Sequence, residues 1–179
     1  MRIVAGESKG RRLRAPAGRA TRPTADRVRE ALFSILGPVE GLRVLDLFAG
    51  SGALGIEALS RGADTAVFVD SDRRAVRAVR GNLDAAGMDG RADVVRADAL
   101  RYLSRARAAG CSFGLILLDP PYDAARRLAE PLAQRLPDLL SDDARIVTES
   151  DKRDPLLLEL PLELERTYGD TRIAVHRGP

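Results

Sequence analysis

The residue types best able to do chemistry form the quartet Asp119-Pro120-Pro121-Tyr122, directly after the apolar run 115–118. Two prolines fix the backbone, and proline has no N–H, so the Pro120 carbonyl can point into a site beside the Asp119 carboxylate. Two adjacent acceptors suit the two hydrogens of one exocyclic amine, and holding both draws the nitrogen lone pair out of conjugation with its ring. Tyr122 adds a face for stacking an extruded base. The quartet therefore predicts a site that grips and activates a planar amine.

A glycine-rich segment, residues 46–55, is the second candidate site. Gly50, Gly52 and Gly55 match the pattern G-x-G-x-x-G, and Asp70 follows Gly50 by twenty residues, so the spacing also fits a dinucleotide site. Glycines let a ligand approach the backbone closely, and an acid at the end of the second strand can accept hydrogen bonds from ribose hydroxyls. The alternative is that the glycines only serve a tight strand-to-helix turn.

Two further carboxylates narrow the class of ligand. Asp46, four residues before Gly50, would repel a pyrophosphate but attract an ammonium group. Asp98, after the third predicted strand, is placed to accept from an adenine amino group. A ligand with ribose, adenine and an amino-acid tail but no phosphate is S-adenosylmethionine. Each carboxylate also has a simpler interpretation: Asp46 as an acceptor for amides of the turn, and Asp98 as a helix N-cap.

Strands and helices alternate around these residues. Strands are predicted at 43–47, 65–69, from 94, at 115–118 and at 145–148, with helices at 53–61 and around 76–83. A further helix begins near Thr24 and ends at Gly37-Pro38, and residues 172–175 alternate like an edge strand. This order predicts a parallel, doubly wound α/β sheet, in which ligands bind at the carboxyl ends of the strands.

The first 38 residues are strongly basic, with nine Lys and Arg side chains against three acids, whereas the rest has 20 against 23. Such clustering predicts a polyanionic partner, because guanidinium groups match phosphate geometry. A bias toward Arg over Lys would explain the residue type but not the clustering. Residues 2–6 and 11–16 predict a hairpin around a Gly-bearing turn. We therefore expect a basic hairpin appendage at 1–20 and a main domain at 21–179.

Composition excludes several classes of protein. The chain has 179 residues, 45% hydrophobic and 31% charged, which suits one ordinary folded domain and excludes a disordered tail. No apolar run reaches the ~20 residues of a membrane span, and no signal peptide is evident, so a cytoplasmic protein is expected. One cysteine, Cys111, and one histidine, His176, exclude a disulfide framework and a zinc site, and no metal is expected. Cys111 is predicted as a core residue, His176 as a surface residue and Glu149 as a pocket-rim or capping residue.

The motifs resemble a known family. Asp-Leu-Phe-Ala-Gly-Ser-Gly at 46–52, the acids Asp70 and Asp98 and the quartet at 119–122 look like class I S-adenosylmethionine-dependent methyltransferases that modify exocyclic amines. The start, Arg-Ile-Val-Ala-Gly at 2–6, Gly-Arg-Arg-Leu at 10–13 and Arg-Pro-Thr-Ala-Asp-Arg-Val-Arg-Glu-Ala-Leu-Phe at 22–33, resembles the RsmD family of 16S rRNA guanine-N2 methyltransferases. The likeness runs from residue 2 to about 150 and then fades.

The resemblance implies a fold and a set of residue roles. The fold is a Rossmann-like, seven-stranded, mostly parallel sheet with helices on both faces and a reversed final strand. Asp70 would hold the ribose hydroxyls, and Asp98 with Ala99 the adenine. The implied cofactor-binding set is Asp46, Phe48, Ala49, Gly50, Ser51, Gly52, Asp70, Asp98 and Ala99. The implied catalytic residues are Asp119, Pro120, Pro121 and Tyr122, and the implied RNA-binding residues are Lys9, Arg11, Arg12, Arg14, Arg22, Arg27 and Arg29.

The predicted function is methyl transfer from S-adenosylmethionine to N2 of a guanine in 16S rRNA within the assembling small ribosomal subunit, by an enzyme expected to be monomeric. The nearest alternative is the same chemistry on another base, such as adenine-N6. A nicotinamide-dependent oxidoreductase and a non-catalytic assembly factor that binds rRNA are the remaining alternatives.

Overall fold

The computed structural model describes residues 1–16, 26–121 and 124–178. In the sequence, turn residues and helical patterns separate the segments that form the strands. The strands are β1 (Arg43–Asp46), β2 (Thr65–Asp70), β3 (Ala92–Arg96), β4 (Phe113–Leu118), β5 (Leu140–Asp151), β6 (Leu162–Tyr168) and β7 (Thr171–Arg177). The helices are α1 (Asp26–Leu36), α2 (Ala53–Ser60), α3 (Arg73–Ala86), α4 (Ala99–Ala108) and α5 (Ala125–Ala133), with short 3-10 turns η1 (Asp89–Arg91) and η3 (Pro137–Leu139).

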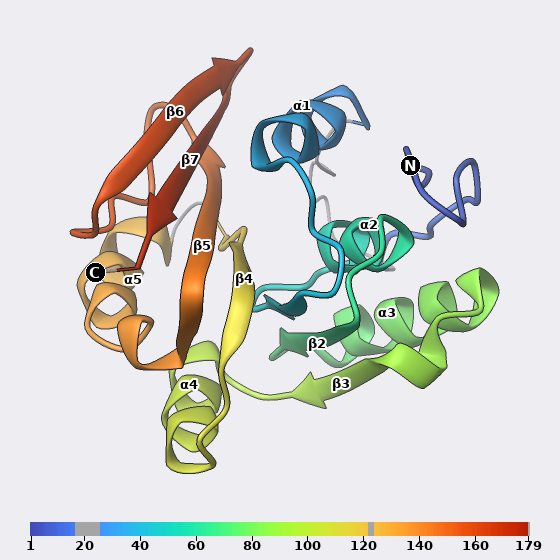
Figure 1. The fold of residues 1–179 in the computed structure, drawn as a ribbon, viewed down its shortest axis with the longest axis horizontal. Helices are drawn as coiled ribbons and strands as arrows, with labels where there is room; N and C mark the ends of the chain where they lie inside the picture. Colours follow the sequence, from blue (N-terminus) through green and yellow to red (C-terminus); the bar gives the residue numbers. More distant parts are fainter. Residues whose placement is uncertain (17–25, 122–123, 179) are drawn as a thin grey trace.

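The strands form one seven-stranded sheet in the order β3-β2-β1-β4-β5-β7-β6. Strands β1 to β5 pair in parallel, while β7 is antiparallel to both β5 and β6. The predicted Rossmann-like sheet with a reversed final strand is therefore confirmed. Because β1 and β4 are neighbours whose connections lead to opposite faces, the switch point lies between their carboxyl ends (Figure 1).

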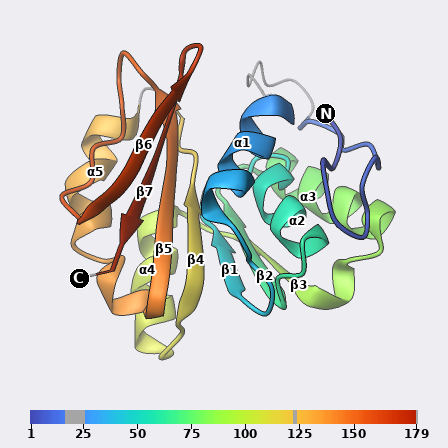
Figure 2. The same ribbon diagram turned by 45° about the horizontal axis from the view of Figure 1, so that its top comes forward.

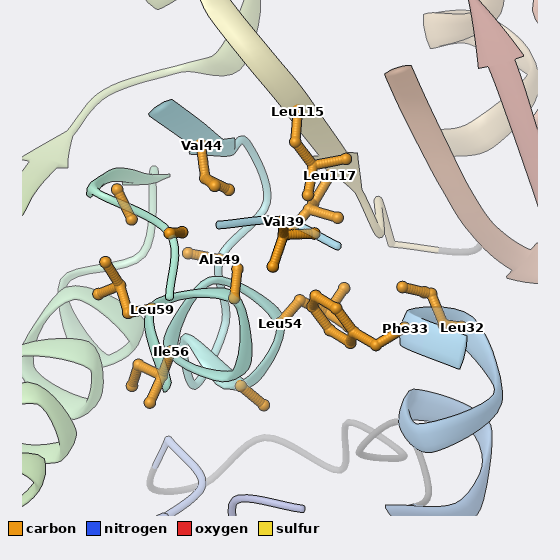
Figure 3. Close-up of a cluster of buried hydrophobic side chains, with 14 of the residues drawn as sticks. Leu32, Phe33, Val39, Val44, Ala49, Leu54, Ile56, Leu59, Leu115 and Leu117 are labelled. Atoms are coloured by element: carbon orange, nitrogen blue, oxygen red, sulfur yellow. The ribbon is translucent and has the colours of Figure 1, made fainter. Parts of the chain in front are cut away.

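Helices cover both faces of the sheet. Helices α1, α2 and α3 lie on one face, and α4 and α5 lie on the other (Figure 2). Figure 3 shows how Phe33 of α1 and Leu54 of α2 meet Leu117 of β4 on the first face. Strand β4 is buried at every position because both faces are covered, which explains its unbroken apolar run.

The C-terminal part differs from the sequence expectation in two places. Residues 172–175, predicted as an edge strand, lie in β7, which pairs on both sides and is buried from Arg172 to His176. The edge strand on this side of the sheet is β6, which was not predicted because its side chains are mostly exposed and its apolar residues are few. His176 is also not a surface residue: it is 3% exposed, and its Nδ1 lies 3.3 Å from the Leu160 carbonyl oxygen.

The N-terminal segment folds back on itself and packs into the body. An antiparallel bridge joins Arg2 to Arg12, and the Ile3 amide donates to the Arg11 carbonyl. Ile3 and Leu13 are 1% and 6% exposed and belong to the core cluster on the α1–α3 face. In place of the two predicted hairpin strands there is a single isolated bridge, and the segment packs against helices rather than projecting from them. Within the described residues, no helix is long and apolar enough to cross a membrane.

Candidate active site

The glycine-rich turn between β1 and α2 is held by acids from two strands. The Asp46 carboxylate at the end of β1 accepts a hydrogen bond from the Gly55 amide at 3.0 Å. At the end of β2, Asp70 accepts from the Gly50 amide at 2.9 Å and, through its other oxygen, from the Asp72 amide at 2.8 Å. These bonds give Asp46 the turn-shaping role considered as its alternative and give Asp70 a similar role that was not predicted. Both acids also line the cavity described below.

Glycine is required at two positions of this turn. Gly52 has a φ of +78°, a left-handed conformation that strains other residues. A Cβ atom on Gly55 would lie 2.3 Å from the Phe68 ring and 3.1 Å from the Asp46 carboxylate. The last glycine therefore serves close packing of α2 on the sheet.

A cavity of about 410 Å³ lies at the carboxyl ends of the strands and brings the predicted cofactor and catalytic residues together. Among the predicted residues, it is lined by Asp46, Phe48, Ala49, Gly50, Ser51, Asp70, Asp98, Ala99, Asp119, Pro120 and Pro121. Gly52 is buried in the turn behind them, and Tyr122 falls outside the described residues. Asp98 also caps α4, since its carboxylate accepts from the Arg101 amide at 3.1 Å.

The cavity has walls that the motif analysis did not identify. Ala53, Leu54, Ser71, Ala97, Ala124, Arg127 and Leu128 line it, as do Met1, Ala15 and Pro16 of the N-terminal segment. The small and apolar residues carry no sequence signal for a site. Arg127 is exposed at the start of α5. Its place in the sequence close after the quartet was the one signal that could have identified it as a cavity residue.

Four carboxylates influence one another here, and three of them, Asp46, Asp70 and Asp119, line the cavity. Burial raises the pKa of Asp46 to about 7, although the Gly55 amide opposes the shift, and the charges of Asp70 and Glu149 add to it. Burial likewise raises the pKa of Asp119 well above its usual range, with further contributions from Glu149 and Asp46. Glu149, predicted as a pocket-rim or capping residue, is 6% exposed near the end of β5 and is not among the residues that line the cavity. Such an acidic cluster favours a cationic ligand, which would relieve the repulsion between the carboxylates.

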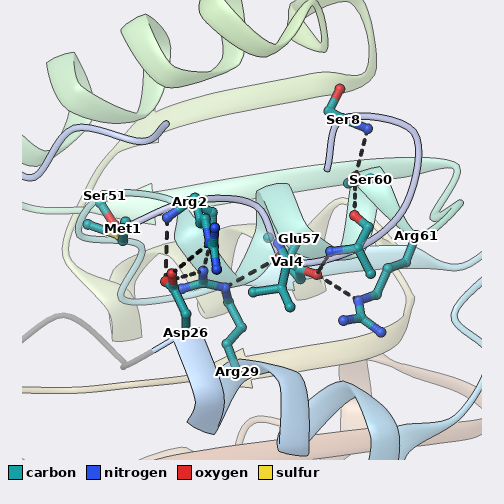
Figure 4. A network of polar contacts seen from close by, with 12 residues as sticks. Met1, Arg2, Val4, Ser8, Asp26, Arg29, Ser51, Glu57, Ser60 and Arg61 are labelled. Atoms are coloured by element: carbon teal, nitrogen blue, oxygen red, sulfur yellow. Dashed lines mark hydrogen bonds and ion pairs between the residues drawn. The ribbon is translucent and has the colours of Figure 1, made fainter. Parts of the chain in front are cut away.

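A buried polar network connects the N-terminal segment to α2. The Glu57 carboxylate accepts from the Val4 and Ala5 amides at 2.8 and 3.0 Å, and it pairs with Arg29 at 3.4 Å and Arg61 at 2.8 Å (Figure 4). Neither the Arg29 nor the Glu57 side chain is exposed to solvent. The helix that begins at the glycine turn therefore also fixes the basic segment.

This network corrects one of the RNA-binding predictions. Arg29 is fully buried, pairs with Asp26 and Glu57, and donates to the Arg2 carbonyl, so it has no surface to offer to RNA. Its position on α1 places it on the apolar side of the helix, where only an acidic partner makes a guanidinium tolerable. Lys9, Arg11, Arg12, Arg14 and Arg27 are exposed, and Arg22 lies outside the described residues.

Comparisons with known proteins agree with this geometry. The family model described as Conserved hypothetical protein 95 matches residues 1–177, so the likeness extends past residue 150, where the sequence analysis placed its end. The candidate rRNA methyltransferase YlbH of Bacillus subtilis is 42% identical over 181 residues, covering 99% of this chain and 98% of its own. Ribosomal RNA small subunit methyltransferase D of Escherichia coli is 40% identical over 159 residues, covering 87% of this chain and 77% of its own.

Solved structures give the same result. The methyltransferase candidate yhhF from Escherichia coli superposes with a TM-score of 0.84 at 35% sequence identity. The superposition covers 99% of this chain and 97% of the other, so the cavity, the reversed strand and the N-terminal segment all fall within the shared region.

Proposed function

This chain belongs to the Conserved hypothetical protein 95 family, which is the RsmD family of rRNA methyltransferases, and we propose that it methylates the exocyclic N2 of a guanine in 16S rRNA. It is an S-adenosylmethionine-dependent methyltransferase that acts on rRNA. The proposal goes further in three respects: the target base is guanine, the methylated atom is N2, and the rRNA belongs to the small subunit.

One observation supports the choice of an amine as the acceptor. Asp119, Pro120 and Pro121 leave β4 at the switch point and line the same cavity as the acids at the ends of β1 and β2. An amine held by the Asp119 carboxylate and the Pro120 carbonyl would lie next to a ligand held by Asp46 and Asp70. The residues proposed to hold the amine and those proposed to hold the cofactor therefore line one cavity, as direct transfer requires.

The described residues suit S-adenosylmethionine in charge and shape. Asp46 and its acidic neighbours fit a ligand with a cationic amino-acid end, and Asp70 lies where ribose hydroxyls can donate to a carboxylate. Asp98, Ala99 and Phe48 offer a polar edge and apolar contacts for adenine. When bound, the cofactor supplies a methyl group on a good leaving group, the sulfonium.

The chain's own residues then have simple tasks. In its ionised form, Asp119 accepts one amine hydrogen while Pro120 accepts the other, which keeps the nitrogen lone pair directed at the methyl group. Once methylated, the nitrogen would lose one proton to Asp119 or to water.

The experiment that tests this function compares three substrates. The protein is incubated with tritiated S-adenosylmethionine and small ribosomal subunits from cells that lack this modification, naked 16S rRNA, or duplex DNA, and the labelled nucleosides are then identified. Label in N2-methylguanosine from the subunits or the rRNA supports the proposal. Label in N6-methyladenine would move the target to another base, and cofactor binding without label would favour a non-catalytic assembly factor.

A further inference from the structure

A second and larger hollow adjoins the active-site cavity. This groove, of about 1430 Å³, runs between the N-terminal segment and α3. Met1 and Ala15 line both the groove and the active-site cavity, so the two spaces adjoin at these residues. Among the described residues, a polymer lying in the groove would meet the cavity at Met1 and Ala15.

The groove is built by specific contacts rather than by loose packing. Asn82 of α3 is 2% exposed, and its side chain accepts from the Arg14 amide at 2.8 Å and donates to the Arg14 carbonyl at 2.9 Å. The same side-chain amide donates to the Ser51 carbonyl of the glycine turn at 2.8 Å. The Ser8 hydroxyl donates to the Ala86 carbonyl farther along α3. These contacts hold the N-terminal segment along α3 and join it to the turn beside the cavity.

The groove walls are basic on both sides. They contribute five arginines and two carboxylates, namely Arg2, Arg12, Arg14, Arg74, Arg77, Asp26 and Asp84. Asp26 is already paired with Arg2 and Arg29. In the part of the chain that the structure describes, the guanidinium groups of Arg12, Arg14 and Arg77 have no hydrogen-bond or ion-pair partner. Exposed guanidinium groups on facing walls suit a chain of phosphates.

We infer that the groove binds the sugar–phosphate backbone of the RNA strand that carries the target base, and that Arg74 and Arg77 of α3 form its second wall opposite Arg12 and Arg14. The inference rests on the proposed function, which supplies the RNA. The sequence analysis assigned RNA binding only to the first 29 residues, and α3 extends that surface to the far side of the groove.

The test uses the full chain and two double variants of equal charge. The first variant is Arg74→Ala with Arg77→Ala. The matched control is Arg73→Ala with Arg105→Ala, since Arg73 is exposed on the same helix outside the groove and Arg105 is exposed on α4. Binding of unmodified 16S rRNA and of small subunits is measured at several salt concentrations, together with binding of S-adenosylhomocysteine.

The groove variant is expected to bind rRNA about tenfold more weakly, with the slope of log affinity against log salt reduced by about 1.4, at roughly 0.7 per lost phosphate contact on a single strand. S-adenosylhomocysteine affinity and kcat should stay at the control's values while KM for the RNA rises. Equal affinity and an equal salt slope in the two variants would overturn the inference. Failure of the proposed function is distinguishable, because there the unaltered protein transfers no label to rRNA in the first place.

Discussion

The Asp46 carboxylate accepts a hydrogen bond from the Gly55 amide at 3.0 Å, although burial raises the pKa of that carboxyl to about 7. A single amide bond therefore does not compensate for the loss of water around the charge. Since the carboxylate also lines the active-site cavity, the remaining compensation is expected from a cationic ligand.

Cofactor affinity should consequently rise with pH. A cationic amino-acid end binds the ionised form of Asp46 better than the protonated form, so the Kd of S-adenosylmethionine should fall as pH rises through about 7. Isothermal titration between pH 6 and 8 measures this, and proton release on binding should accompany it. The Asp46→Asn variant should bind weakly and lose the pH dependence; the same dependence in the variant would assign it to another group.

The same shift predicts how stability depends on pH. Because the pKa of Asp46 is raised in the folded state above its usual 3.8, the folded ligand-free protein holds a proton that the unfolded chain has released. The stability that this proton provides is present at low pH and is lost as pH rises toward about 7. Asp46→Asn should therefore flatten the dependence of Tm on pH between 3.8 and about 7, measured without cofactor.

Asp119→Asn separates catalysis from cofactor binding. The amide keeps the shape of the side chain but loses the charge that holds the amine hydrogen, so the rate of methyl transfer should fall by about 10²–10³. Affinity for S-adenosylhomocysteine should change little, because the acids assigned to the cofactor lie on other strands. Single-turnover transfer and titration calorimetry check both parts, and a large loss of cofactor affinity would contradict the assigned role.

Gly55→Ala should disturb the turn that carries the cofactor site. Its Cβ would lie 2.3 Å from the Phe68 ring, which is buried and cannot move aside, so unfolding should cost about 1–3 kcal/mol less than in the unaltered protein. Gly81→Ala is the control. Gly81 lies in α3, and the added Cβ would have no neighbouring atom within 4 Å, so this change should stabilise the protein by about 0.5–1 kcal/mol. Urea unfolding of both variants measures the difference, and equal effects would mean that the close approach is not limiting.

Arg29→Ala should destabilise the protein by about 3 kcal/mol, because it leaves buried Glu57 without one of its charged partners. This loss of stability is at the low end for a broken buried ion pair, since Arg61 and two backbone amides still contact the Glu57 carboxylate. Urea unfolding gives the loss, and hydrogen exchange at Val4 and Ala5 should become faster. Glu30→Ala, an exposed change on the same helix, should leave both measurements unaltered.

Periodicity predicted the central strands well because their residues are buried on both faces, as in the run 115–118. It missed β6, whose alternation is limited to Leu162 and Leu164 and whose side chains are mostly exposed. The motifs predicted most of the acids that line the active-site cavity, since acids at strand ends meet at one edge of a parallel sheet. The family resemblance and the basic composition placed Arg29 among the RNA contacts, because no local pattern reveals that Glu57 would lie beside it. Asn82 was missed for the same reason.

The contacts of the N-terminal segment also determine when, during synthesis, this segment can pack against the rest of the protein. Its partners, Glu57, Asn82 and Ala86, lie about fifty to eighty residues later in the chain. A chain leaving the ribosome therefore carries its most basic stretch unattached until α2 and α3 have emerged, because loops of this length must close before the contacts form. The basic surface of this enzyme is consequently among the last parts of the N-terminal half to be completed, although it is the first to be translated.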